Sequence, residues 1–217
     1  MPTRRRFLGL TAATLALWPF ASSRAALVAG RDYALVEFPQ PTVDPKRVEV
    51  LELFFYGCPH CFELEPLLAK WLKTLPRHAY FRRMPAVFHD GWVPLAKAYY
   101  AIEALGLVDR LHAAVFDAIH LQGANLNKRD NLLRFVAAQG VDAARFGAAY
   151  DSAAVGTKVQ QARELTSAYG IQGVPSMIID GRYRTSSSQT GGHERLFPVL
   201  DELIALAWRE RSAKRAS

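Results

Sequence analysis

The spacing of apolar residues after position 47 predicts a strand, a helix and a second strand. Residues 48–55 (VEVLELFF) are rich in β-branched and aromatic residues, which predicts a largely buried strand that ends at Gly57. A helix should begin around Cys58 and Pro59, because proline is favoured in the first helical turn, and should run toward Leu72. Residues 79–84 are a candidate second core strand.

Helical spacing dominates from about residue 92 to residue 169. Asn127 and Asp142 can each cap a helix in this block, because their side-chain oxygens accept hydrogen bonds from free N–H groups. The helix that begins near Asn127 is expected to stop at Gly140. The apolar residues at helical spacing include Val108, Leu111, Val115, Ile119, Leu132, Leu133, Val136, Val155, Val159, Ala162 and Tyr169.

Strand character returns near the end of the chain. Met177-Ile178-Ile179 is followed by Asp180-Gly181, a strong hairpin signal, with Tyr183 on the return strand. Residues 196–208 have the pattern of an amphipathic helix, in which Pro198 is tolerable only in the first turn. The order of elements predicts an α/β fold with an inserted helical domain. We expect the sheet domain to comprise residues 26–88 and 166–217, and the helical insertion to comprise residues 89–165.

The first 25 residues have the three-part pattern of a secretory signal peptide. A basic start is followed by an apolar run over residues 7–20, which is too short to span a bilayer comfortably. The small residues that follow fit cleavage after Ser23 or after Ala25. Residues 3–9 (TRRRFLG) also resemble the twin-arginine export signal. Either route leads to an oxidising compartment, so we expect the protein in the periplasm.

Composition and charge indicate a globular domain and give little support for a nucleic-acid partner. Hydrophobic residues make up 50% of the chain and charged residues 22%, which suffices for a packed core. The net charge is +7, but residues 1–25 hold four arginines and no acid, so the rest carries 23 basic against 20 acidic residues, or +3. The only two cysteines cannot form a disulfide framework, so their chemistry belongs to one site.

The motif Cys58-Pro59-His60-Cys61 places two thiols at the start of the first predicted helix. Free backbone N–H groups and the helix dipole stabilise a thiolate at Cys58, whereas Cys61 lies one turn in and is shielded. His60 can add positive charge or a hydrogen-bond donor near the Cys58 sulfur. Stabilising the reduced form makes the disulfide form more oxidising, so the motif favours a donor of disulfides that reacts through a mixed disulfide.

Other chemistries of the cysteine pair fit the sequence less well. A zinc site needs four ligands, and the chain has no second cysteine pair. A c-type haem requires histidine directly after the second cysteine, where this chain has Phe62. A copper(I) site of two thiolates stays open chemically, and an inert disulfide would stabilise little because its loop is short. We therefore expect no metal and no cofactor.

Residues 51–55 (LELFF) followed by the Cys-Pro-His-Cys motif resemble the DsbA family of bacterial disulfide oxidases, of the thioredoxin superfamily. Gly173-Val174-Pro175 resembles that family's cis-proline loop, and the resemblance extends from about residue 33 to about residue 208. It implies a thioredoxin fold, oxidation of unfolded exported proteins that contain cysteine pairs, and reoxidation by an inner-membrane quinone reductase of the DsbB type. It also implies a cis bond before Pro175, with Val174 offering backbone groups to an extended substrate.

Two acidic residues are candidates for a supporting role. Glu52 lies six residues before Cys58 and on the same strand face as Val48 and Val50, where a lone carboxylate is costly to bury. It is either a proton acceptor or relay for Cys61, which the family resemblance favours, or a partly exposed acid at a strand end. Glu65 follows Cys61 by four residues. It either tunes the thiol pKa or forms a surface pair, for example with Lys70.

The remaining histidines and tryptophans are expected to be structural. No pair of these histidines has a ligand spacing that indicates a metal site, so surface or hydrogen-bonded core positions are expected for His78, His89, His112, His120 and His193. Core packing is expected for Trp71, Trp92 and Trp208.

The leading hypothesis is a monomeric periplasmic thiol–disulfide oxidoreductase, not itself membrane-spanning, that donates a disulfide of Cys58 and Cys61. A reductase or an isomerase is the first alternative. Thioredoxin-like reductases usually carry tryptophan before the first cysteine, where this chain has Tyr56-Gly57, and the few residues before the first strand leave no room for an isomerase's dimerisation domain. A redox-inactive chaperone or copper-binding module is the second alternative. Replacing both cysteines with serine would distinguish it.

Overall fold

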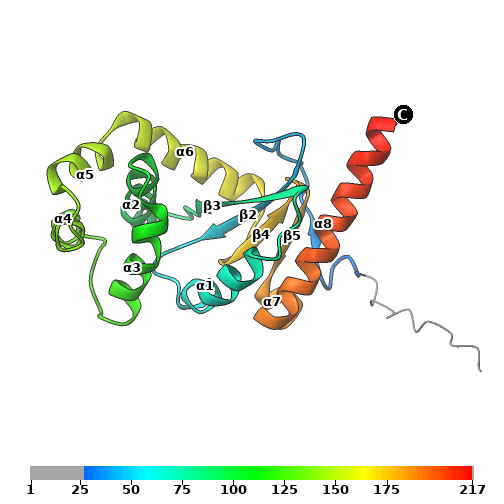
Figure 1. The fold of residues 1–217 in the computed structure, drawn as a ribbon, viewed down its shortest axis with the longest axis horizontal. Helices are drawn as coiled ribbons and strands as arrows, with labels where there is room; N and C mark the ends of the chain where they lie inside the picture. The colour runs from blue at the N-terminus through cyan, green and yellow to red at the C-terminus, as the bar shows by residue number, and fades with distance from the viewer. Residues whose placement is uncertain (1–26, 217) are drawn as a thin grey trace, which may run out of the picture.

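A five-stranded mixed sheet forms the centre of the protein (Figure 1). The computed structural model describes residues 27–216, so the expected signal peptide, residues 1–25, lies outside the described residues. Across the sheet the strands follow the order β1-β5-β4-β2-β3. Their bounds are β1 Ala34–Leu35, β2 Val48–Phe54, β3 Ala79–Pro85, β4 Ser176–Ile179 and β5 Tyr183–Ser186.

Strand β2 lies between β4 and the edge strand β3 and is buried along its whole length. It pairs in parallel with β3 and antiparallel with β4. In the second pairing Leu53 stands opposite Ser176, so the end of β2 lies beside the start of β4. This register brings the segment before β4, which contains Pro175, next to the segment after β2, which contains Cys58. The hairpin from β4 to β5 turns at Asp180 and Gly181, which both have positive φ, as expected for this turn.

The helices gather in two places around the sheet. In Figure 1, α2 to α6 form a group at the left of the view, and α8 lies at the opposite end. The group follows β3 and precedes β4 in the chain; the exact limits of the insertion, residues 89–165, stay a prediction. The helix bounds are α1 Pro59–Leu72, η1 Asp90–Trp92, α2 Val93–Ala104, α3 Val108–His120, α4 Arg129–Ala138, α5 Ala143–Tyr150, α6 Ala153–Ala168, α7 Ser187–Thr190 and α8 His193–Ala216.

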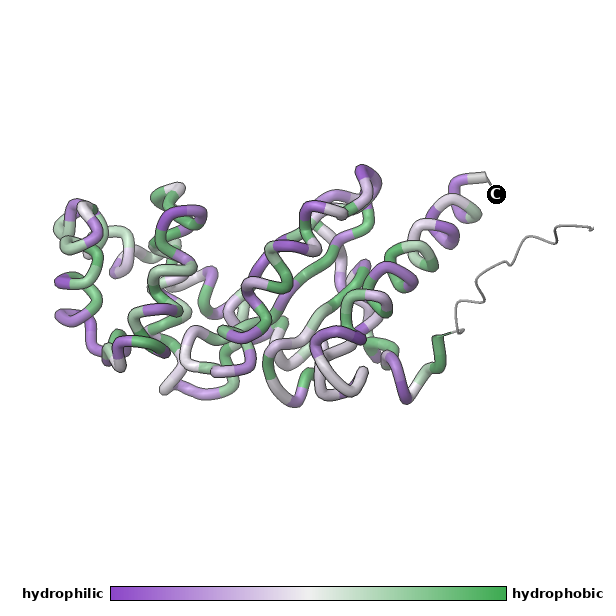
Figure 2. Tube along the Cα trace, turned by 60° about the horizontal axis from the view of Figure 1, so that its bottom comes forward, coloured by the Kyte–Doolittle hydropathy of each residue, from purple (hydrophilic) through white to green (hydrophobic). Residues whose placement is uncertain are grey.

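Two apolar cores form on the sheet because successive side chains of β2 point to opposite faces. Val48 and Val50 pack with α1 and α8, whereas Leu51 and Leu53 pack with the helical group. Hydrophobic and hydrophilic segments alternate along α8 in Figure 2, as expected for a helix with one buried face. No helix among residues 27–216 combines the length and the apolarity of a membrane span.

Most of the predicted elements are present, but two helix starts were predicted wrongly. Helix α4 begins after Lys128, whose side chain makes no cap, and not at Asn127. Helix α8 begins at His193 and continues to Ala216, so Pro198 lies in its second turn. The buried apolar side chains that α8 packs on the sheet outweigh the one backbone N–H that Pro198 lacks. The predicted cap at Asp142 is confirmed, because its Oδ1 accepts hydrogen bonds from two backbone N–H groups of α5.

Candidate active site

The two cysteines lie where the chain passes from β2 into α1. Cys58 is the residue before the helix, in an extended conformation, and Pro59 is the first helical residue. The carbonyl oxygen of Cys58 accepts the N–H of Phe62, which places its sulfur beside the free N–H groups of the first turn. A side chain at Gly57 would meet the ring of Phe55, which stacks on Trp92 with centroids 3.9 Å apart.

The two thiols differ strongly in environment and in acidity. Cys58 is half-buried, and its pKa is lowered from 9.0 to about 6. The hydrogen bond from the Cys61 thiol contributes most, followed by the backbone N–H groups of Cys61 and His60 and by the charge of His60. Cys61 is fully buried, and burial together with its contact to Cys58 raises its pKa. Cys58 is therefore the thiolate at neutral pH and Cys61 the thiol.

The loop before β4 meets Cys58 directly. The Sγ of Cys58 lies 3.4 Å from the carbonyl oxygen of Val174, and the peptide bond between Val174 and Pro175 is cis. The hydroxyl of Ser176 donates to the carbonyl oxygen of Gly173 at 2.7 Å and so ties the loop to the first residue of β4. This loop contains the three residues that the sequence predicted as substrate-binding.

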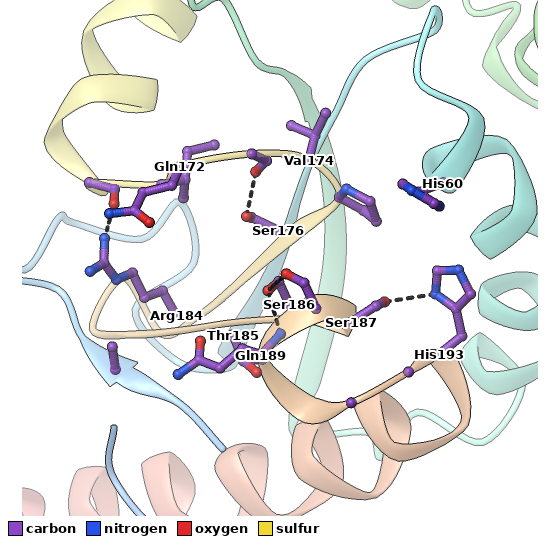
Figure 3. Close-up of a pocket in the computed structure, with 18 of the residues that line it drawn as sticks. His60, Gln172, Val174, Ser176, Arg184, Thr185, Ser186, Ser187, Gln189 and His193 are labelled. Carbon is purple, nitrogen blue, oxygen red and sulfur yellow. Dashed lines mark hydrogen bonds between the residues drawn. The ribbon is translucent and has the colours of Figure 1, made fainter. Parts of the chain in front are cut away.

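A groove of about 860 Å³ runs from this loop toward α7 and the start of α8 (Figure 3). Gly173, Val174 and Pro175 line it together with His60 and with the segment that follows β5. The groove therefore places the backbone of an irregular loop within reach of the reactive thiol, where an extended peptide can pair with it.

A buried group of charged side chains lies beneath the cysteines. Glu52 on β2 stands opposite Arg83 on β3, with Oε2 3.0 Å from Nε, and is 0% exposed. Arg83 also donates to Glu65 of α1 at 2.9 Å. Although Glu52 and Arg83 are within ion-pair distance, neither Glu52 oxygen has a well-directed hydrogen bond among the described residues. A partly exposed acid at a strand end is therefore excluded for Glu52.

The two acids of this group have opposite pKa shifts. Burial, assisted by the negative charge of Glu65, raises the pKa of Glu52 to about 8 against the opposing charge of Arg83. Burial also works to raise the pKa of Glu65, but the hydrogen bond with His112 and the charge of Arg83 outweigh it and lower the pKa. At neutral pH Glu52 can therefore hold a proton that Glu65 has lost.

The sequence did not predict the partners of these acids. Glu65 contacts Arg83 and His112, whose Nε2 lies 3.2 Å from Glu65 Oε1, rather than Lys70. His112 is buried, and its Nδ1 lies 2.9 Å from the hydroxyl of Tyr56, so it is a hydrogen-bonded core histidine as expected. The sequence could have indicated that Arg83 pairs with a buried acid, because an arginine inside a predicted core strand needs a buried partner.

The other histidines and tryptophans have the following contacts. His78 stacks on Trp208, His120 stacks on Phe62, His89 accepts the N–H of Gly91, and Trp71 is buried with its Nε1 donating to Asp201. His193 lies beside His60 and Glu63, a grouping that the sequence spacing did not predict.

A buried thiol and an acidic, accessible thiol at the start of a helix, facing a cis-proline loop on a mixed sheet, define a thiol–disulfide oxidoreductase with a thioredoxin fold. The comparisons with known proteins agree. Residues 72–203 match the DSBA-like thioredoxin domain. The chain belongs to the DsbA family of thiol:disulfide interchange proteins.

Similar proteins cover the part of the chain that contains the cysteines as well. The thiol:disulfide interchange protein DsbA of Pseudomonas syringae pv. tomato is 37% identical over 215 residues, which are 98% of this chain and 99% of that protein. The DsbA of Burkholderia cepacia is 39% identical over 184 residues, 84% of this chain and 87% of that protein. The crystal structure of Pseudomonas aeruginosa DsbA superposes with a TM-score of 0.81 at 35% identity, covering 87% of this chain and 97% of that chain.

Proposed function

We propose that this thiol–disulfide oxidoreductase acts in the periplasm as a donor, passing a disulfide of Cys58 and Cys61 to unfolded exported proteins that contain cysteine pairs. The observation that supports this direction is the low pKa of Cys58, about 6, beside the raised pKa of Cys61. A stabilised thiolate favours the reduced form of the enzyme, and the disulfide form is correspondingly more oxidising.

The transfer takes two exchange steps. A substrate thiolate attacks Cys58 Sγ of the disulfide form, the bond between the cysteines breaks, and Cys61 leaves and takes up a proton. A second substrate thiolate then attacks the substrate sulfur of the mixed disulfide, and Cys58 leaves as the stabilised thiolate. The substrate gains one disulfide, and its two electrons reduce the enzyme to the dithiol.

The surrounding residues have distinct roles in this scheme. Glu52, whose pKa is raised by burial, supplies the proton that Cys61 takes up, and Glu65 and Arg83 hold it in position. Backbone groups of Gly173, Val174 and Pro175 bind the extended substrate beside Cys58. The charge of His60 and the helix start at Pro59 stabilise the thiolate that leaves last.

In the proposed reaction cycle, a partner protein restores the disulfide of Cys58 and Cys61. A DsbB-type quinone reductase of the inner membrane takes the two electrons and restores the disulfide, and the protein works as a monomer. Export by the signal of residues 1–25 places it in the compartment where disulfides persist.

A single-turnover assay tests the direction of transfer. The disulfide form is mixed, without air or glutathione, with an excess of a reduced peptide that contains two cysteines. We expect one peptide disulfide for each enzyme molecule, and none with Cys58→Ser. A peptide that stays reduced, while the dithiol enzyme reduces the same peptide's disulfide, would show a reductase instead.

A further inference from the structure

Three side chains lie together at the end of the groove nearest the cysteines. His60 and Glu63 come from the first turns of α1, and His193 is the first residue of α8. One nitrogen of each histidine and a carboxylate oxygen of Glu63 all lie within 4.8 Å of one another. We propose that these three side chains bind a divalent transition-metal ion of the zinc class, and that the bound ion obstructs the groove.

The separations are close to those of a zinc site. Zinc ligands about 2.0–2.2 Å from the ion in a tetrahedral arrangement lie roughly 3.3–3.6 Å from one another. His60 Nδ1 is 3.1 Å from Glu63 Oε2, and His193 Nε2 is 3.8 Å from the same oxygen. The side chains of His60 and Glu63 are 72% and 57% exposed, so each is free to close the remaining distance by rotation.

His193 is the anchored ligand of the three. Its side chain is 21% exposed, and its Nδ1 lies 2.7 Å from the hydroxyl of Ser187 on α7, as Figure 3 shows. A metal-binding histidine usually has its second nitrogen held by such an outer partner, which fixes the ring and the tautomer. Here that contact leaves Nε2 directed toward Glu63, the geometry that a metal ion requires.

The type of ligands selects the ion. Imidazole nitrogen and carboxylate oxygen suit zinc, and three protein ligands leave a fourth position open to water. Zinc also undergoes no redox change, so it neither accepts nor donates the electrons that the cysteines exchange. The sequence did not predict this site, because His193 lies more than a hundred residues from His60 and Glu63 and the three residues form no known motif.

The position of the site connects metal binding to substrate access. His60 and His193 both line the groove that Val174 and Pro175 border (Figure 3). An ion held between them joins α1 to α8 across the end of the groove next to Cys58. Zinc should therefore slow the oxidation of peptides. This consequence rests on the proposed function, whereas the binding itself does not.

Zinc binding is tested on the disulfide form, in which neither cysteine offers a thiolate to the metal. Protein stripped with EDTA and dialysed is titrated with zinc chloride in a calorimeter. We expect one zinc ion for each chain, and at least tenfold weaker binding in His193→Ala and in Glu63→Gln. Ser187→Ala, which removes only the outer partner, should weaken binding about tenfold. His89→Ala removes an exposed histidine elsewhere and should bind as the wild type does.

Two results would overturn the site. One is a wild-type dissociation constant weaker than about 1 mM. The other is equal binding by the wild type, His193→Ala and Glu63→Gln, which would show the three side chains to be a surface ion pair only. Glu63 is exposed, so Glu63→Gln keeps the test valid if His193→Ala fails to fold.

The effect on catalysis is measured with the single-turnover peptide assay, each variant being compared with itself in EDTA. Zinc should slow the wild type and His89→Ala but leave His193→Ala unchanged. Equal slowing of all three would assign the effect to zinc bound by the peptide thiols and would overturn the obstruction. Absence of peptide oxidation in EDTA would contradict the proposed function and leave the calorimetric result standing.

Discussion

Glu52 and Arg83 stand opposite each other in the parallel pairing of β2 with β3, with 3.0 Å between carboxylate oxygen and guanidinium nitrogen. The register of the two strands therefore places these side chains together on one face of the sheet. Because Arg83 also binds Glu65, two acids share one cation. Burial, assisted by the negative charge of Glu65, therefore outweighs the charge of Arg83 and raises the pKa of Glu52.

Glu52→Gln should stabilise the protein at alkaline pH. The folded pKa of Glu52, about 8, exceeds the ordinary value of 4.5. At a pH between these two values, the folded state therefore retains a proton that the unfolded state has released. The wild type therefore loses stability as pH rises through that window, and the glutamine variant does not. Urea unfolding at pH 8 should show a gain on the order of 2 kcal/mol from this linkage, shrinking toward pH 5.

The control for this variant is Glu49→Gln, which removes another buried acid of the same strand. Glu49 is paired with Arg82 at 2.8 Å, so its loss should destabilise the protein. A Glu52→Gln variant that is less stable than the wild type at pH 8 would show that Glu52 is charged in the folded protein.

Glu52→Gln should also slow the first exchange step. Glutamine has no proton to give to Cys61, and loss of a positioned proton donor costs about a hundredfold or more in rate. Stopped-flow measurement of peptide oxidation should show this loss, together with a flatter pH dependence around pH 8. An unchanged rate and pH profile would remove Glu52 from the proton transfer.

The two cysteine variants should behave differently. In Cys61→Ser the accessible Cys58 remains, so incubation with glutathione disulfide should give a stable mixed disulfide that mass spectrometry detects. In Cys58→Ser the remaining thiol is fully buried, and the adduct should form at least tenfold more slowly. Similar adduct yields in both variants would contradict the assigned roles.

Cys58 should titrate with a pKa of about 6. The pH dependence of its alkylation by iodoacetamide measures this value, and His60→Ala should move it back toward 9.0, because the charge of His60 contributes to the shift. Since the folded pKa is depressed, the thiolate stabilises the dithiol form fully above pH 9, and this contribution is lost as pH falls toward 6. An unshifted pKa of Cys58 in the wild type would contradict the claim that a stabilised thiolate makes the disulfide form oxidising.

Local pattern was sufficient to predict the parts of the fold that local physics determines. The run of residues 48–55, the proline after Cys58 and the Asp180-Gly181 turn each carry their structure within a few residues. The start of α8 was predicted wrongly for the same reason. The preference of proline for the first helical turn is a local rule. The helix extends beyond Pro198 on both sides because its apolar side chains pack against the sheet.

The parts of the site that were missed depend on contacts between distant residues. Glu65 meets Arg83 and His112, which lie 18 and 47 residues away. The register of β2 with β3 places Arg83 there, and the packing of α3 on α1 places His112. His193, which lies near His60, is the first residue of α8, a helix that begins three residues earlier than its apolar pattern suggests.

The reduction potential of the protein tests the central claim most directly. It is measured by equilibrating the enzyme with glutathione buffers and determining the fraction of Cys58 and Cys61 in the disulfide. We predict a strongly oxidising value, close to the about −120 mV that characterises DsbA. A value near about −270 mV, as in thioredoxin, would contradict the donor function and indicate a reductase.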